Sequence, residues 1–397
     1  MRRALLTYLI VFLTILPNSY AGAQNDPVIM PEEGFMSGAV DDQDYMNSYQ
    51  TGREYFFLRS GRVKMVIQSD KSGLAPAFTY MLFDAENPGQ TARKTNAINY
   101  IKGTNFSQTG LKVILGKVEF TALGHNSEAK WVIRNGSAAV ELLWWAGGIR
   151  VEESFALSDK SGNFIRTISF TNADLAGDDT IRIGSLDGFE ESQPVPLKKG
   201  ETITHIREIK VPDFLTTEGS TNLINPLSSV ITSDSLIFSL YRNASFALPG
   251  MVSEKGRMDA GVFEYGNQWV RDGSNVAMGL IYAGSFENAK GLLTYILSDL
   301  VSDEGSMAIA GGFDKPDREE FDQMGVLMNC LKLHLEWTGD SSLLINYHEK
   351  ILTLIERYLN PVFRDSTGMV HNKREFWERT FSDGYELAYQ TCMIQGL

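Results

Sequence analysis

Carboxylates and tryptophans lie together in two short stretches of the C-terminal half, residues 268–272 (QWVRD) and 375–379 (EFWER). A tryptophan ring offers a sugar a flat apolar face, and carboxylates and arginine form charged hydrogen bonds to hydroxyl groups. Cleavage of a glycosidic bond needs a carboxylic acid that protonates the leaving oxygen and a second carboxylate that activates water or attacks carbon. These residue types fit carbohydrate chemistry. Acids at a helix start beside a core tryptophan would give the same pattern for structural reasons.

Other catalytic signatures are missing from the sequence. It contains no Gly-x-Ser-x-Gly, no His-Glu-x-x-His, no Walker loop and no dinucleotide-binding glycine fingerprint. The five histidines are scattered without the spacing of metal ligands. We therefore expect neither a metal nor a cofactor, which leaves carboxylates and aromatic residues to carry any chemistry.

The elements that position these residues change type along the chain. From about residue 54 to 243, short alternating segments separated by Gly, Asn, Asp and Ser predict antiparallel strands, and so many strands in succession predict a β-sandwich. The segments predicted as strands include residues 62–68, 113–120, 131–134, 148–155, 164–170 and 231–241. After Pro249, apolar residues recur at intervals of three and four, which predicts helices. The fold class is thus β followed by α, and residues 268–272 are expected to open a helix.

The N-terminus has the pattern of an export signal. Arg2 and Arg3 precede an apolar run over residues 4–16, and Ala21 and Ala23 occupy the positions that a signal peptidase reads. The run is shorter than the roughly 20 residues that span a bilayer. We expect cleavage after Ala23, a periplasmic or secreted protein, and no membrane span after cleavage.

Charge and composition exclude several partner classes. The chain of 397 residues has 36 Lys and Arg against 49 Asp and Glu, a net charge of −13, which argues against nucleic acid as a partner. Cys330 and Cys392, both in predicted helices, are expected to be buried free thiols. Trp131, Trp144 and Trp145 are expected in the core of the strand half, with a second sugar platform as the alternative.

The order of several motifs resembles that of the glucoamylase-like glycoside hydrolases, a group that includes bacterial glucoamylases and glucodextranases. The motifs, in order, are Trp269-Val270-Arg271-Asp272, Gly284 and Ala289, Asp322-Gln323-Met324-Gly325, Thr338-Gly339-Asp340, and Phe376-Trp377-Glu378-Arg379. The resemblance covers roughly residues 263–397 by motif and the preceding strands by pattern only. It implies an N-terminal β-sandwich followed by an (α/α)6 barrel.

Carried over by position, the resemblance assigns roles to six residues. Glu378 would be the general acid, and Arg271 and Asp272 would hold the sugar at the non-reducing end. Trp269 and Trp377 would shape the pocket. Arg379 is counted with the substrate-binding residues. It follows Glu378 where fungal members have a second glutamate, which is a departure from the family pattern.

The expected activity is the release of glucose or a related sugar from α-linked oligosaccharides or polysaccharides, with inversion. Two alternatives remain at this stage. One is a glycoside phosphorylase of similar architecture, and the other is a non-catalytic carbohydrate-binding protein whose sandwich does the binding.

The sequence predicts four regions: a signal peptide (1–23), a lead-in without regular structure (24–50), the sandwich (51–245) and the first part of the barrel (246–397). Too few helical segments follow Pro249 for a closed ring of twelve helices. We therefore expect an incomplete barrel without its general base, inactive alone, with apolar surface exposed at Leu327, Leu331, Leu354 and Tyr389.

Overall fold

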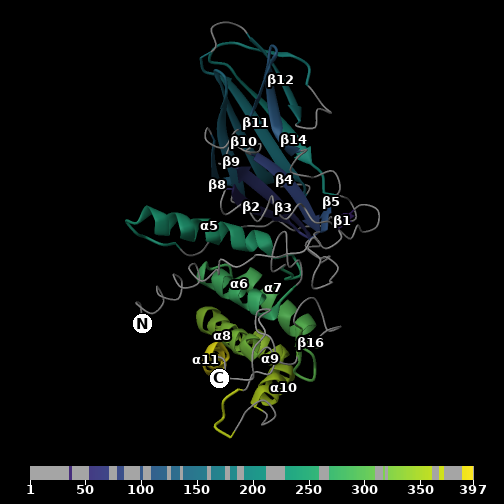
Figure 1. Ribbon diagram of the computed structural model, residues 1–397, viewed down its shortest axis with the longest axis vertical. Helices are drawn as coiled ribbons and strands as arrows, with labels where there is room; N and C mark the ends of the chain where they lie inside the picture. Colours follow the sequence, from purple (N-terminus) through teal and green to yellow (C-terminus); the bar gives the residue numbers. More distant parts are fainter. Residues whose placement is uncertain are drawn as a thin grey trace.

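A computed structural model of the chain shows β-sheets in the N-terminal half and helices in the C-terminal half (Figure 1), which confirms the predicted order. It describes residues 35–37, 53–70, 78–84, 99–101, 109–122, 127–134, 137–158, 162–174, 179–185, 192–211, 229–258, 268–308, 316–317, 321–359, 366–370 and 387–396. None of the helices in these ranges is long and apolar enough to cross a membrane.

Three antiparallel sheets form the described part of the N-terminal half. The first, in the order β1-β5-β4-β3-β2, contains β1 (Phe35–Ser37), β2 (Arg53–Ser60), β3 (Val63–Asp70), β4 (Phe78–Asp84) and β5 (Asn99–Ile101). The second, β13-β12-β6-β7, contains β6 (Leu111–Leu115), β7 (Val118–Thr121), β12 (Asp179–Ser185) and β13 (Val195–Leu197). The third, β14-β11-β10-β9-β8, contains β8 (Glu128–Arg134), β9 (Ser137–Ala146), β10 (Ile149–Leu157), β11 (Phe164–Asn172) and β14 (Thr202–Ile209).

One apolar core joins the three sheets. Phe56 of β2, Val113 of β6 and Phe155 of β10 are each at most 5% exposed and belong to the same cluster. The alternation that predicted strands is clearest in β11, where every second residue from Phe164 to Asn172 is buried. Because successive side chains of a strand point to opposite faces, this alternation makes one face of each sheet apolar and drives the sheets together.

Two details of the strand half differ from prediction. Residues 113–120 are not one strand but the hairpin β6–β7, turned at Gly116, whose φ of 60° suits glycine. The lead-in, predicted without regular structure, contains β1, which pairs with β5.

The predicted strand over residues 231–241 is wrong. Helix α5 (Ser235–Met251) occupies this segment, and Asp234 caps it by accepting hydrogen bonds from the backbone N–H groups of Leu236 (2.9 Å) and Ile237 (3.2 Å). Capping satisfies N–H groups that a helix start otherwise leaves free, so it favoured a helix over the apparent alternation. The helices therefore begin before Pro249, and α5 runs across the predicted boundary at residues 245 and 246.

The predicted helices after Pro249 are confirmed in the described residues. They are α6 (Val270–Tyr282), α7 (Phe286–Tyr295), the π-helical turn η3 (Ile296–Leu300), α8 (Phe321–Thr338), α9 (Ser342–Asn346), α10 (His348–Leu359) and α11 (Leu387–Gly396). A two-stranded ribbon, β15 (Met307–Ala308) and β16 (Pro316–Asp317), lies between η3 and α8. Gly284 and Gly339 follow α6 and α8 with φ of 78° and 70°, as expected for residues that end helices.

The helices have a core of their own. Leu327, Leu331 and Leu354 are at most 3% exposed within it, so the expectation that these residues would show apolar surface is wrong. Neighbouring helices cover them, because α8 packs against α6, α7, α10 and α11. The side chain of Tyr389 lies outside the described residues.

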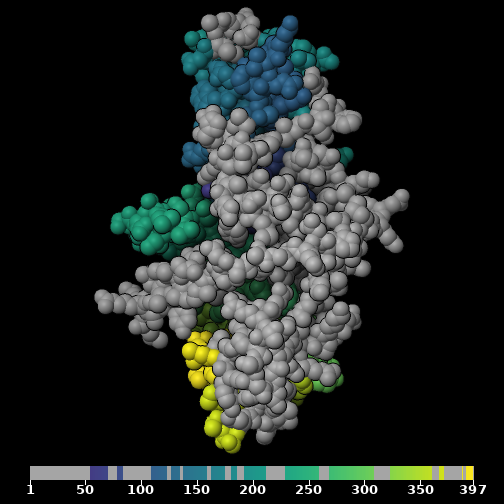
Figure 2. All heavy atoms as spheres, in the orientation of Figure 1, coloured from purple at the N-terminus to yellow at the C-terminus, as the bar shows by residue number. Residues whose placement is uncertain are grey.

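The two halves meet along α5 and the turn between β2 and β3. Phe246 of α5 stacks on Trp131 of β8 at a ring distance of 5.5 Å, and Arg242 donates to the Trp131 carbonyl (2.7 Å). Arg59 of β2 reaches the helical half, where it donates to the Val252 carbonyl and to Oδ1 of Asn288 on α7 (3.3 Å). Figure 1 shows α5 lying across the end of the sheets, with α6 and α7 beyond it, and Figure 2 shows α5 projecting from the side of the molecule.

Candidate functional site

The start of α6 carries three of the residues singled out in the sequence. Trp269 is the N-cap in an extended conformation, and the N–H of Gly273 donates to its carbonyl (2.9 Å). Arg271 and Asp272 follow in the first turn, where the helix dipole favours an acid. The prediction that residues 268–272 open a helix is therefore confirmed.

Arg271 is held by an aspartate from another helix. Its Nη1 donates to Oδ2 of Asp322, in the first turn of α8, over 2.7 Å, and the two side chains are 14% and 5% exposed. A buried ion pair of this kind fixes the guanidinium in one position, which a flexible surface arginine would not hold. Asp322 belongs to one of the motifs that carry the family resemblance, but the resemblance assigns it no role.

Asp272 lies in the same environment. Burial raises the pKa of its carboxyl group, the charge of Arg271 lowers it in part, and Asp322 raises it further. Arg271 is therefore flanked by two carboxyl groups that differ in setting. Asp322 is paired with the guanidinium, whereas Asp272 has a strengthened tendency to bind a proton.

Polar atoms near this pair lack a hydrogen-bond partner among the described residues. They are Nε1 of Trp269, Oγ of Ser274 and Oδ1 of Asp322, and all three are buried. Buried polar atoms are nearly always hydrogen-bonded in folded proteins. They are one indole donor, one hydroxyl and one carboxylate acceptor, and each is a type of group that can bind a hydroxyl of a polar ligand.

Helix α11 closes one side of this region. A Cβ atom at Gly325 of α8 would overlap the Cys392 carbonyl, so glycine allows the two helices to touch. The ion pair also affects the pKa of the Cys392 thiol. Burial raises its pKa to about 11, with a further increase from Asp322 and a decrease from Arg271.

Cys330 and Cys392 are both free, and Cys330 is fully buried, as expected. Cys392 is only partly buried.

The second predicted stretch, residues 375–379, is not among the described residues. Trp377, Glu378 and Arg379, like residues 1–23, lie outside the described residues. Within the part of the chain that the structure describes, no three His, Cys, Asp or Glu side chains gather as metal ligands would.

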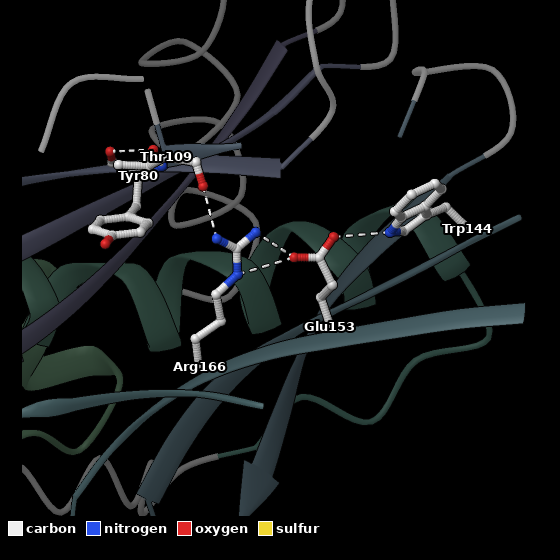
Figure 3. Close-up of polar contacts among 5 residues, drawn as sticks. All are labelled: Tyr80, Thr109, Trp144, Glu153 and Arg166. Atoms are coloured by element: carbon white, nitrogen blue, oxygen red, sulfur yellow. Dashed lines mark hydrogen bonds and ion pairs between the residues drawn. The ribbon is translucent and has the colours of Figure 1, made fainter. Parts of the chain in front are cut away.

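A separate polar cluster lies inside the strand half (Figure 3). Glu153 accepts from Trp144 Nε1 (2.8 Å) and from the Nε (3.1 Å) and Nη2 (2.5 Å) atoms of Arg166. Arg166 also donates to the Thr109 carbonyl (2.7 Å), and the Thr109 hydroxyl bonds to the backbone of Tyr80. Glu153 and Arg166 are almost fully buried and form an ion pair with one another, so this cluster joins five segments of the chain rather than offering a site.

The tryptophans of the strand half divide into two groups. Trp131 and Trp144 are 2% and 1% exposed, which confirms the core interpretation for them. Trp145 is 45% exposed, so for this residue the core interpretation is wrong. It follows Trp144 on β9 and points to the opposite face of the sheet.

Comparison with known proteins identifies no relative: no protein-family model matches the chain, and no curated protein matches it.

Proposed function

We propose that the protein is an exo-acting glycoside hydrolase that releases glucose or a related sugar from the ends of α-linked oligosaccharides, with inversion. The observation that carries this proposal is the fixed Arg271–Asp322 pair beside Asp272 and Trp269 at the start of α6. A guanidinium and carboxylates held in place bind sugar hydroxyls through charged hydrogen bonds, and an adjacent indole offers an apolar face.

We also propose that the protein has the architecture of the family that its motifs resemble. The strand half would be a β-sandwich, the helices would be part of an (α/α)6 barrel, and the chain would be glucoamylase-like. The order of sheets and helices and the confirmed helix start at Trp269-Val270-Arg271-Asp272 support this assignment.

In the proposed reaction, Glu378 donates its proton to the glycosidic oxygen as the bond from that oxygen to the anomeric carbon breaks. A second carboxylate takes a proton from the water that attacks this carbon from the opposite face, which requires two carboxyl groups roughly 6.5–9.5 Å apart. Arg271 and Asp272 hold the terminal sugar while this occurs. The proposal assigns no residue of the 397 as the general base.

Binding of maltotriose and isomaltotriose to the full chain, measured by calorimetry, tests the site directly. Asp272→Asn keeps the shape but removes the charge, and loss of a charged hydrogen bond worth about 1.5–3 kcal/mol should weaken binding at least tenfold. Asp303→Asn is the matched control, because Asp303 is 86% exposed and pairs with Lys350 of α10 instead of Arg271. Equal affinity of Asp272→Asn and wild type would contradict the proposal, as would the absence of binding to both sugars.

Turnover separates the enzymatic alternatives. If the full chain releases glucose, dependence of the rate on phosphate would identify a phosphorylase instead of a hydrolase. Glu378→Gln should then reduce turnover by about 10²–10⁴-fold, the usual contribution of a general acid.

A further inference from the structure

The sheet β14-β11-β10-β9-β8 has one face in the core and one face outward. Because side chains alternate, the register of the five strands places the outward residues in rows across the sheet. One row is Trp145, Arg150, Thr171 and Thr202. The next is Glu128, Leu143, Glu152, Ser169 and Thr204, and a third is Lys130, Glu141, Ser154, Thr167 and Ile206.

Trp145 is the distinctive residue of this face. Its side chain is 45% exposed at the end of a row, directly opposite Arg150 on the neighbouring strand. Charged and hydroxyl side chains make up most of the remaining rows. An indole ring half in water beside hydrogen-bonding groups is a common feature of sites for ligands with one apolar and one polar side.

Positive and negative residues of the face balance one another: two ion pairs form on it, and Glu128 and Lys130 carry opposite charges on β8. Arg150 Nη2 lies 2.7 Å from Glu152 Oε1, and Arg134 Nη2 lies 2.5 Å from Glu141 Oε1. Paired charges of opposite sign give no strong net field, so the face does not attract an anionic or cationic polymer by charge. They still offer hydrogen bonds to neutral groups, and because exposed pairs contribute only about 0–1 kcal/mol to stability, the fold does not require them.

Hydroxyl groups continue the face across β11 and β14. Ser169 and Thr204 bond at 2.9 Å, and Thr171 and Thr202 bond at 2.8 Å. The surface is hollowed beside them into a shallow groove whose walls include Glu141, Arg150, Glu152, Thr167 and Ser169. Three strand spacings separate Trp145 from Thr202, which is about 14 Å, a length suited to a chain of sugars rather than to one sugar.

We propose that this outer face binds a neutral polysaccharide chain, with Trp145 stacking on a sugar ring and Arg150 and Glu152 bonding to hydroxyls. The occupant is neutral because the charges of the face balance one another, and it is polyhydroxylated because the face is a broad array of donors and acceptors around one aromatic ring. This site is distinct from the start of α6 and lies in the other half of the molecule (Figure 1), so it stands independently of the catalytic proposal.

Affinity electrophoresis of the full chain tests the proposal. Native gels would contain soluble starch, dextran, pullulan, xylan or hydroxyethyl cellulose as neutral probes, with alginate as the anionic probe. We expect at least one neutral polymer to retard the wild type, alginate not to retard it, and Trp145→Ala to weaken the apparent affinity at least tenfold. Trp337→Ala is the matched control, because Trp337 is 49% exposed on α8, packs edge-on against Tyr282 and lies outside this face, so its loss should leave the retardation unchanged.

The outcomes separate this face from the α6 site. Trp145→Ala should keep the wild-type circular dichroism spectrum and melting temperature, and Asp272→Asn should be retarded like the wild type. The proposal is overturned if no neutral polymer retards the chain, if Trp145→Ala is retarded equally, if alginate retards it, or if Asp272→Asn removes the retardation. Trp145→Phe, which keeps an aromatic ring, should retain part of the affinity.

Discussion

Arg271 of α6 and Asp322 of α8 form a largely buried ion pair, with side chains 14% and 5% exposed, at 2.7 Å; it joins the first turns of two helices 51 residues apart in the chain. Hydrogen-bonded charges so far from water depend on each other, because the loss of one leaves the other without compensation.

Asp322→Asn should therefore destabilise the protein by about 3 kcal/mol, since asparagine keeps the shape but leaves the Arg271 charge unpaired. Urea unfolding followed by circular dichroism measures the difference. Asp303→Asn, at an exposed ion pair with Lys350, should cost no more than about 1 kcal/mol. Similar costs for the two variants would show that the Arg271–Asp322 pair does not stabilise the helical half.

Asp272 should give the protein a distinct pH dependence. Burial raises the pKa of its carboxyl group above the unfolded value, so the stability that it contributes is complete below the unfolded pKa and is lost as pH rises through the folded pKa. Asparagine has no ionisable carboxyl group, so the Asp272→Asn variant does not lose stability in this way as pH rises. Asp272→Asn should thus be more stable than wild type at pH 7, and the difference should vanish below about pH 4.

The same urea titrations, repeated between pH 3.5 and 8, check this expectation. A wild type that is more stable than Asp272→Asn at pH 7, by a margin that grows with pH, would show that the attraction of Arg271 outweighs burial.

Glu153→Gln should destabilise the strand half by about 3–5 kcal/mol, because it leaves the buried Arg166 charge unpaired. The neighbouring Glu152→Gln is a close control, since Glu152 is 47% exposed and pairs with Arg150 at the surface. Its cost should stay within about 1 kcal/mol. Thermal unfolding in the near ultraviolet, which reports on Trp144, would refute the assignment if both variants melted together.

Gly325→Ala should weaken the contact of α8 with α11, because the added methyl group meets the Cys392 carbonyl. Such overpacking costs about 1–3 kcal/mol. Gly291→Ala in α7 should instead stabilise the protein. The new Cβ would lie 4.0 Å from Gly256 Cα, an ordinary contact, and alanine favours a helix by up to about 1 kcal/mol. Denaturant midpoints that moved the same way in both variants would contradict this account.

Local patterns predicted most of the elements and little of the contacts between them. The strands β10 and β11 and the helices α6 and α8 follow from side-chain periodicity within each segment. The ion pair of Arg271 with Asp322 depends on how two helices cross, and that of Glu153 with Arg166 depends on packing inside the sheets, so neither was visible in the residue order. The exposure of Trp145 had a local signal, since adjacent strand residues face opposite sides and Trp144 is in the core.

The error at residues 231–241 has a physical cause as well. Half of α5 is exposed, including Leu236, Phe238 and Leu240, so its apolar residues do not mark a buried face with helical spacing. Asp234 was the informative residue, as an N-cap immediately before the helix.

The placement of Phe246 determines when the strand half can be completed during synthesis. Trp131 is covered on one side by Phe56 and on another by Phe246, which emerges from the ribosome only after all of the described strands of the three N-terminal sheets. A nascent chain that has reached residue 211 therefore presents an open, apolar end at Trp131, available to a chaperone until α5 arrives. A protease that cut between residues 211 and 235 would leave the sheets and their final packing segment as separate pieces that must find each other by diffusion.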